Sequence, residues 1–359
     1  MKVLVVDDSA LVRKLLGQVF AAEGDFEVQF ARNGLEALDR LGAYKPDVIT
    51  LDINMPQLDG LATLDRIMIE HPCPVVMVSS LTAEGAETTL EALRLGAVDF
   101  VAKPGGAVSL RLDEFAPQVV AKVRAAAGAR LRSVHRLKDR VRYRIGAAPV
   151  ALPRKAWTTS PAPALKAAAG PGLVLVGTST GGPPALEALL KPLPADFPWP
   201  IVVAQHMPAS FTGALARRLD GLCALNVVEV AHSTLLQAGT VYVGRGDADV
   251  VVARRAAGLT AVPVTSEAGY PRHPSTDRLV RSAMDHLPAS QLVGVLMTGM
   301  GDDGAQAMTK LRSLGGRVIA EAEETAVVWG MPGELVRAGG ADIVVPVQMI
   351  AERLRALTP

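Results

Sequence analysis

The sequence predicts an α/β protein with two doubly wound parallel sheets, one in each half of the chain. Short apolar runs alternate with stretches of helical periodicity on both sides of a Pro- and Ala-rich segment. The chain has 359 residues, of which 49% are hydrophobic, and this is enough for two cores. We therefore expect one domain at residues 1–125, a linker at 126–169 and a second domain at 170–359.

The first domain contains short β-rich runs separated by helical patterns. Leu11, Leu15 and Val19, for example, recur at the spacing of one helix face. Strands that alternate with helices favour a parallel sheet with helices on both faces. The expected strands cover residues 2–8, 26–31, 47–53, 74–80 and 98–104.

Polar residues follow four of these runs at the point where each strand ends. Asp7 and Asp8 follow the first, Asp52 the third, Ser79 the fourth and Lys103 the fifth. Because the carboxyl ends of parallel strands share one edge of a sheet, these side chains can converge. Clustered carboxylates suit Mg²⁺, and a nearby ammonium and hydroxyl suit a phosphorylated carboxylate. The alternative, helix capping by the aspartates and a solvated lysine, does not explain why these residue types occur at four strand ends.

The linker is strongly basic. Between Arg130 and Lys166 there are ten Lys or Arg residues against one acidic residue, a net charge of +9. We consider two interpretations: a surface for an acidic partner, or a solvated spacer. The rest of the chain is acidic and has no helix-turn-helix pattern, which disfavours a nucleic-acid partner. We also expect a cytoplasmic protein without membrane insertion, because no signal peptide or spanning segment is evident.

The second domain begins with an apolar run and a Gly-rich turn, "VLVGTSTGGPPALEALL", with Ser179 at its apex. The pattern G-x-S-x-G between a strand and a helix is typical of a nucleophile elbow. A glycine-rich turn that binds an anion is an equally good interpretation of this stretch alone.

Two later runs offer partners for Ser179. His206 follows "WPIVVAQ", and Asp303 lies in the turn "TGMGDDG" after another apolar run. All three residues therefore follow expected parallel strands, whose ends share one crevice. A hydroxyl, an imidazole and a carboxylate in that order form an acyl-transfer triad.

The first domain resembles a two-component receiver domain through "VVDDS", "DINMPQLDG", "VSSLT" and "DFVAKP". The resemblance implies a flavodoxin-like fold with Asp52 as the phosphoacceptor. It further implies that Asp7, Asp8, Asp52 and the backbone carbonyl of Asn54 form the Mg²⁺ site. Ser79 and Lys103 would contact the phosphoryl group, and Phe100 occupies the position of the aromatic switch.

The second domain resembles the catalytic domain of the chemotaxis protein-glutamate methylesterase family, CheB. The matching segments are "GTSTGGPPAL", "QHMP", "FTGALARRL", "PSTD", "GVLMTGMGDDGAQAM" and "VVWGMP". The resemblance implies a Rossmann-like fold, with Ser179 as nucleophile, His206 as base and Asp303 as the third triad member. Thr180 and Met300 would line the site.

That resemblance also implies the reaction and its control. Family members hydrolyse glutamate methyl esters on methyl-accepting chemoreceptors, deamidate receptor glutamines and need no cofactor for hydrolysis. A chemotaxis histidine kinase would supply the phosphoryl group, and the unphosphorylated receiver would cover the crevice that contains Ser179. The alternatives are a receiver-containing adaptor and an esterase of a non-chemotaxis signalling array.

Two positions depart from the family pattern. Asp302 stands where the best-known members have Asn, and we expect its side chain to be exposed. His273 stands where we expect Arg, and we expect it to pack within its loop and not to act as a second base.

Overall fold

We describe the protein from a computed structural model, which describes residues 1–80, 82–103, 112–130 and 170–358. The chain divides into two compact units, Met1–Ala162 and Pro163–Pro359. Most of the expected linker, residues 131–169, lies outside the described residues. None of the helices in the described ranges is long and apolar enough to cross a membrane.

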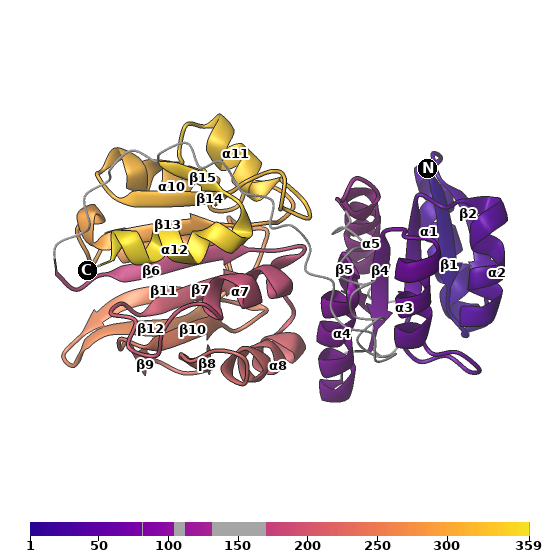
Figure 1. The fold of residues 1–359 in the computed structure, drawn as a ribbon, viewed down its shortest axis with the longest axis horizontal. Helices are drawn as coiled ribbons and strands as arrows, with labels where there is room; N and C mark the ends of the chain where they lie inside the picture. The colour runs from indigo at the N-terminus through magenta and orange to yellow at the C-terminus, as the bar shows by residue number, and fades with distance from the viewer. Residues whose placement is uncertain (81, 104–111, 131–169, 359) are drawn as a thin grey trace, which may run out of the picture. The chain divides into compact units, whose positions relative to one another are not determined.

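The N-terminal unit contains a five-stranded parallel sheet in the order β2-β1-β3-β4-β5, with helices between successive strands (Figure 1). All five strands fall within the runs expected from the sequence. The elements are β1 (Lys2–Val6), α1 (Ala10–Glu23), β2 (Glu27–Ala31), α2 (Gly34–Tyr44), β3 (Val48–Asp52), α3 (Gly60–Glu70), β4 (Val75–Ser79), α4 (Ala83–Leu95), β5 (Asp99–Ala102) and α5 (Leu112–Ala127).

The central strands of this sheet are apolar because both of their faces are covered. Every residue of β3 and β4 is buried. Helix α1 begins where the Ser9 side chain accepts a hydrogen bond from the Val12 N–H, and it ends at Gly24, whose φ of 77° favours glycine. These local signals fix the loop after β1, which carries Asp7 and Asp8.

The C-terminal unit contains a seven-stranded parallel sheet in the order β15-β14-β13-β6-β7-β10-β8 (Figure 1). Its elements are β6 (Leu173–Thr178), α7 (Gly182–Leu190), β7 (Ile201–Gln205), α8 (Ala209–Asp220), β8 (Asn226–Val230), β9 (Thr234–Leu235), β10 (Thr240–Gly244), β11 (Ala248–Arg255), β12 (Gly258–Thr265), α9 (Thr276–Met284), η2 (Ala289–Gln291), β13 (Leu292–Leu296), α10 (Ala305–Ser313), β14 (Arg317–Glu321), α11 (Met331–Arg337), β15 (Ile343–Val345) and α12 (Val347–Leu357).

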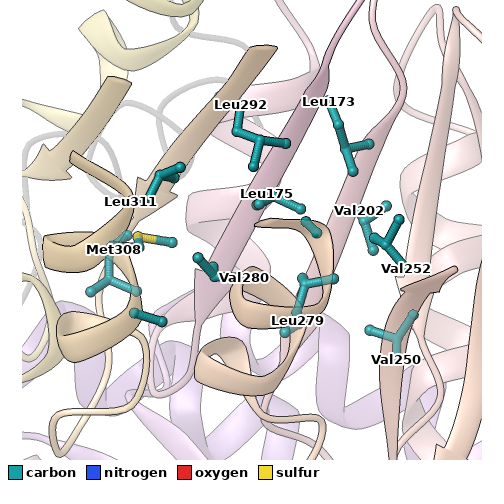
Figure 2. Close-up of a cluster of buried hydrophobic side chains, with 14 of the residues drawn as sticks. Leu173, Leu175, Val202, Val250, Val252, Leu279, Val280, Leu292, Met308 and Leu311 are labelled. Carbon is teal, nitrogen blue, oxygen red and sulfur yellow. The ribbon is translucent and has the colours of Figure 1, made fainter. Parts of the chain in front are cut away.

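The expected pair of doubly wound parallel sheets is confirmed, but the second unit also has a small antiparallel sheet that we did not predict. Its strand order is β11-β12-β9, and β11 and β12 form a hairpin from Ala248 to Thr265. Figure 2 shows Val250 and Val252 of this hairpin near Leu279 of α9 and Val202 of β7. The hairpin and α9 therefore share one core with the parallel sheet.

Candidate functional site

Ser179 lies at the centre of the second sheet, directly after β6. In that sheet the chain runs from β6 outward to β7 on one side and later returns to β13 on the other, so the switch in strand order lies at β6. The Ser179 N–H donates to the Thr298 carbonyl over 2.9 Å. The turn continues through Gly181, whose φ of 75° is left-handed. Ser179 is therefore held between two neighbouring strands at the usual ligand crevice of this fold.

The backbone at Ser179 is closely surrounded. A Cβ added at Gly299 would lie 2.7 Å from the Ser179 Cβ, so only glycine allows this approach. The buried Gln205 amide donates from Nε2 to the carbonyls of both Ser179 and His206, over 3.0 Å each. One side chain thus bridges the two segments that carry Ser179 and His206.

His206 follows β7, and its N–H donates to the Thr178 carbonyl over 3.1 Å. Its ring nitrogen Nε2 lies 2.8 Å from Oδ2 of Asp303, while Nδ1 is buried and has no hydrogen-bond partner among the described residues. The structure therefore brings His206 and Asp303 together. It places Ser179 on the adjacent strand end, but in the described structure its hydroxyl makes no hydrogen bond to the ring.

The Asp303 carboxylate is a heavily bonded acceptor. Beside His206, it accepts from the Ser275 hydroxyl over 2.8 Å and from the N–H groups of Thr276 and Asp277 over 2.6 and 3.2 Å. Burial alone would raise the pKa of Asp303, but the hydrogen bond and charge of His206 and these N–H groups lower it below its ordinary value. Asp303 is therefore an ionised acceptor at neutral pH.

Thr180 and Met300 lie in the two turns beside Ser179. Thr180 is buried, and its carbonyl accepts from the Thr298 hydroxyl over 2.8 Å, whereas Met300 is half-buried. The Thr298 hydroxyl also accepts from the Val328 N–H, so it joins the turns after β6 and β13 to the segment after β14. These contacts hold in place the turns that carry Thr180 and Met300.

The two departures from the family pattern have structural explanations. Asp302 is exposed, so our expectation for this side chain is confirmed. His273 lies 3.0 Å from the buried Asp249 through Nδ1, and Asp249 also pairs with Arg278 over 2.7 Å. His273 thus makes a structural contact that ties its loop to β11, which agrees with the packing role expected for it.

The first sheet carries a separate group of charged residues at its carboxyl edge. Carboxylate oxygens of Asp7, Asp8 and Asp52 lie within 4.8 Å of one another. The Lys103 ammonium is 3.0 Å from Asp7 and 2.9 Å from Asp52. Burial, and then the charge of Asp7, raise the pKa of Asp52, while the hydrogen bond from Lys103 opposes them. The edge therefore holds a metal-like acidic cluster with one neutralising lysine.

The residues of this cluster fit a small divalent cation. They supply oxygen atoms only, and Oδ2 of Asp7 is buried without a hydrogen bond of good geometry although Lys103 is near. This oxygen pairs with the Lys103 ammonium over 3.0 Å, and its second lone pair can face a cation. Asn54 is exposed two residues beyond Asp52, where its backbone carbonyl was expected to contribute.

The remaining receiver residues lie near this edge. The Lys103 N–H donates to the Ser79 carbonyl over 2.7 Å, but the Ser79 hydroxyl is engaged by Thr89 over 2.8 Å. Phe100 is buried, and the Lys122 ammonium lies 4.9 Å from its ring centroid. Ser79 and Lys103 are thus neighbours, while the hydroxyl of Ser79 is directed to α4 in this structure.

Some residues of the site were not assigned a role from the sequence. Gln205, Ser275 and Thr298 all lie inside the segments quoted for the resemblance and are all buried. The available signal was a polar residue one to a few positions from a strand end, and turn preferences alone explain such residues equally well.

Comparisons with known proteins show two family matches. A model described as "Response regulator receiver domain" matches residues 3–112, and one described as "CheB methylesterase" matches residues 174–354. Protein-glutamate methylesterase/protein-glutamine glutaminase 2 of Rhodopseudomonas palustris (strain BisB18) is 60% identical to this chain. The match covers 98% of this chain and 96% of the relative. Protein-glutamate methylesterase/protein-glutamine glutaminase 3 of Rhodospirillum rubrum is 52% identical, and the match covers 99% of this chain and 95% of the relative.

The second unit also resembles a solved structure. The CheB methylesterase catalytic domain of Thermotoga maritima is 36% identical with a TM-score of 0.51, and the match covers 53% of this chain and 100% of that one. The chain belongs to the CheB methylesterase family.

Proposed function

We propose that this protein is a phosphorylation-activated serine hydrolase that removes methyl groups from glutamate methyl esters on chemoreceptors and deamidates receptor glutamines. The observation that carries the proposal is the 2.8 Å contact between His206 Nε2 and Asp303 Oδ2 beside the Ser179 turn. The names of relatives that match nearly the whole chain support it.

The protonation of His206 follows from its partner. Because Asp303 is ionised, its carboxylate can only accept, so Nε2 of His206 carries the proton in their hydrogen bond. The other nitrogen, Nδ1, then has a free lone pair and is buried without a partner among the described residues. Nδ1 is therefore the atom that takes the proton from Ser179.

The reaction follows from these assignments. As the Ser179 oxygen attacks the ester carbonyl carbon, its proton passes to His206 Nδ1, and a tetrahedral oxyanion forms. The C–O bond to the methoxy group then breaks, and His206 returns the proton to release methanol. Water, deprotonated by the same nitrogen, hydrolyses the acyl-Ser179 to a glutamate carboxylate. With a glutamine substrate the leaving group is ammonia.

The turns around Ser179 are suited to the oxyanion. Ser179 lies beside the N-terminus of α7, where the helix dipole favours negative charge, although Pro183 and Pro184 of the first turn carry no N–H. We assign Thr180 and Met300 to the wall of this pocket, with the Met300 N–H as a donor. The fixed position of both turns on Thr298 supports this assignment.

In the receiver unit we assign Asp52 as the phosphoacceptor. Asp7, Asp8, Asp52 and the Asn54 carbonyl would hold Mg²⁺, which supplies positive charge that stabilises a phosphoryl group on Asp52. Lys103 already contacts Asp52 and would pair with a phosphoryl oxygen, and Ser79 would do so after its hydroxyl leaves Thr89. The expected phosphodonor is a chemotaxis histidine kinase. We also propose the domain limits 1–125 and 170–359, with a linker at 126–169.

Methanol release from methylated receptor membranes tests the proposal directly. Wild-type protein should release methanol, more rapidly with a small phosphodonor, whereas Ser179→Ala should release it roughly 10⁴-fold or more slowly. Ser313→Ala is a matched control, because Ser313 is an exposed serine at the end of α10. Equal release by wild type and Ser179→Ala would overturn the assignment.

A further inference from the structure

We infer that Ser275 is a positioning residue of the hydrolase site and fixes the triad carboxylate from the side opposite His206. This inference rests on the proposed triad. Ser275 lies in the "PSTD" segment immediately before α9 and is completely buried. Its hydroxyl donates to Asp303 Oδ1 over 2.8 Å, while His206 contacts the other carboxylate oxygen, Oδ2. With the N–H groups of Thr276 and Asp277, these two side chains hold both oxygens of the carboxylate.

The hydroxyl of Ser275 is suited to this position because it also accepts a hydrogen bond. The Arg278 N–H donates to Ser275 Oγ over 3.3 Å, as expected at the N-cap of a helix. A serine hydroxyl has one proton to donate, and with the Arg278 N–H on its acceptor side that proton is directed to Asp303. The helix cap therefore sets the orientation of the donor.

The position of Ser275 is itself fixed by a buried acid. Its N–H donates to Oδ1 of Asp249 over 2.7 Å, and Asp249 is held in turn by Arg278 and His273. Asp249 lies on β11, in the hairpin that the sequence did not predict. The hairpin thus has a role in the site: it anchors the loop that presents Ser275.

The first turn of α9 is also confined sterically. A Cβ added at Gly177 or Gly304 would come within 2.4 and 2.7 Å, respectively, of the Thr276 side chain. Thr276 therefore packs against the backbone of β6 and of the Asp303 loop at the same time. Because both segments carry triad residues, Ser275 is part of a rigid support and not of a loose surface turn.

Two substitutions separate the donor from the helix cap. Ser275→Gly and Ser275→Ala both remove the hydroxyl, but glycine is a much better N-cap residue than alanine. If the donor matters, both variants should lose kcat for methanol release by a similar factor, about 10- to 100-fold, with little change in KM. If only the cap matters, the glycine variant should be close to wild type, and that result would overturn the inference.

The pH profile gives a second measurement. A carboxylate with one donor fewer holds the imidazolium of His206 more strongly, so the acid limb of kcat/KM should move to higher pH in both variants. Asp277, whose pKa is raised by burial and also by the charge of Asp303, is unchanged in both variants. A loss of kcat without any movement of the acid limb would indicate a purely structural role and contradict the inference.

The matched control is Ser282→Ala on the same helix. The Ser282 hydroxyl also has two hydrogen-bond partners, the Leu279 carbonyl and the Val252 N–H, but neither belongs to the triad. This variant should retain the wild-type kcat and pH profile. All proteins are assayed as the full chain with phosphodonor, beside Ser179→Ala. Failure of the proposed hydrolase would show as equal release by wild type and Ser179→Ala, whereas failure of this inference leaves that difference intact.

Discussion

Each parallel sheet carries an aspartate at its carboxyl edge that is largely shielded from solvent, and the surroundings of these two aspartates shift their pKa values in opposite directions. Asp303 accepts hydrogen bonds from His206, a hydroxyl and two backbone N–H groups, and its pKa is lowered. Asp52 is held by Lys103 and the Ile53 N–H and faces Asp7, and its pKa is raised. Burial raises the pKa of both carboxyls, so the donors and the neighbouring charges, Asp7 beside Asp52 and His206 beside Asp303, make the difference.

This difference explains how one type of residue serves two purposes. The Asp303 oxygens are already occupied, so the carboxylate orients and stabilises an imidazolium without becoming a nucleophile. Asp52 has fewer donors and a repelling neighbour, so it gains most from a cation and is available to attack a phosphoryl group. The parallel sheet places each aspartate at its carboxyl edge. The groups around the carboxylate then determine whether it orients an imidazolium or attacks a phosphoryl group.

The largest effect is expected from a substitution of Asp303, which removes the ionised acceptor of the His206 hydrogen bond. Asp303→Asn keeps the size of the side chain, but an amide nitrogen can face His206, so the ring is no longer held as the Nε2–H tautomer. We expect kcat to fall about 10⁴-fold while KM changes little. Steady-state methanol release measures this, and ¹⁵N NMR of the ring reports the tautomer. Retention of the wild-type rate would remove Asp303 from the triad.

The corresponding change at Asp52 should affect regulation and leave hydrolysis intact. Asp52→Ala should release methanol like unphosphorylated wild type and show no response to a phosphodonor, because the phosphoacceptor is gone. Removal of residues 1–165 should give constitutive activity. The assay is methanol release with and without phosphodonor. An inactive 166–359 fragment that is folded by circular dichroism would contradict control by inhibition.

The sequence predicted the residues at the carboxyl edges of the two sheets better than the residues that hold them in place. Strand alternation predicted that Asp7, Asp52 and Lys103 lie on one edge and Ser179, His206 and Asp303 on another, because the carboxyl ends of parallel strands lie on the same edge of a sheet. It did not predict that Asp249 on an antiparallel hairpin holds Ser275, since a hairpin that covers a sheet has no fixed register with it. Nor did it predict that the Thr89 hydroxyl donates to the Ser79 hydroxyl, because this contact depends on side-chain rotamers.

A smaller effect is expected on stability in the receiver unit. Because the pKa of Asp52 is raised in the folded state, its ionised form opposes folding at neutral pH, and the cost disappears as pH falls below the ordinary carboxyl range. Asp52→Asn should therefore raise the free energy of unfolding at neutral pH, and this gain should shrink as the pH falls through the carboxyl range. Thermal unfolding at several pH values measures this. Mg²⁺ should stabilise the wild type more than the variant.

The exposed Asp39 on α2 provides the control for that experiment. Asp39→Asn changes the net charge by the same amount but lies outside the acidic cluster of Asp7, Asp8 and Asp52. It should respond to pH and Mg²⁺ as the wild type does. If Asp39→Asn and Asp52→Asn were equally stabilised, general charge would explain the effect and the local repulsion would not.

The smallest effect is expected from a substitution of Asp302. Because Asp302 and Asp303 are adjacent, this substitution compares two neighbouring aspartates of one turn. Asp302 is exposed and Asp303 is enclosed by donors, although both are aspartates in the same turn. Asp302→Asn removes one exposed charge near His206, and exposed charges interact weakly and are screened by salt. We expect kcat/KM to change by less than about twofold, with the change decreasing as salt is added. A loss comparable to that of Asp303→Asn would mean that the negative charge of the turn as a whole, and not the bonded carboxylate of Asp303, sustains the imidazolium.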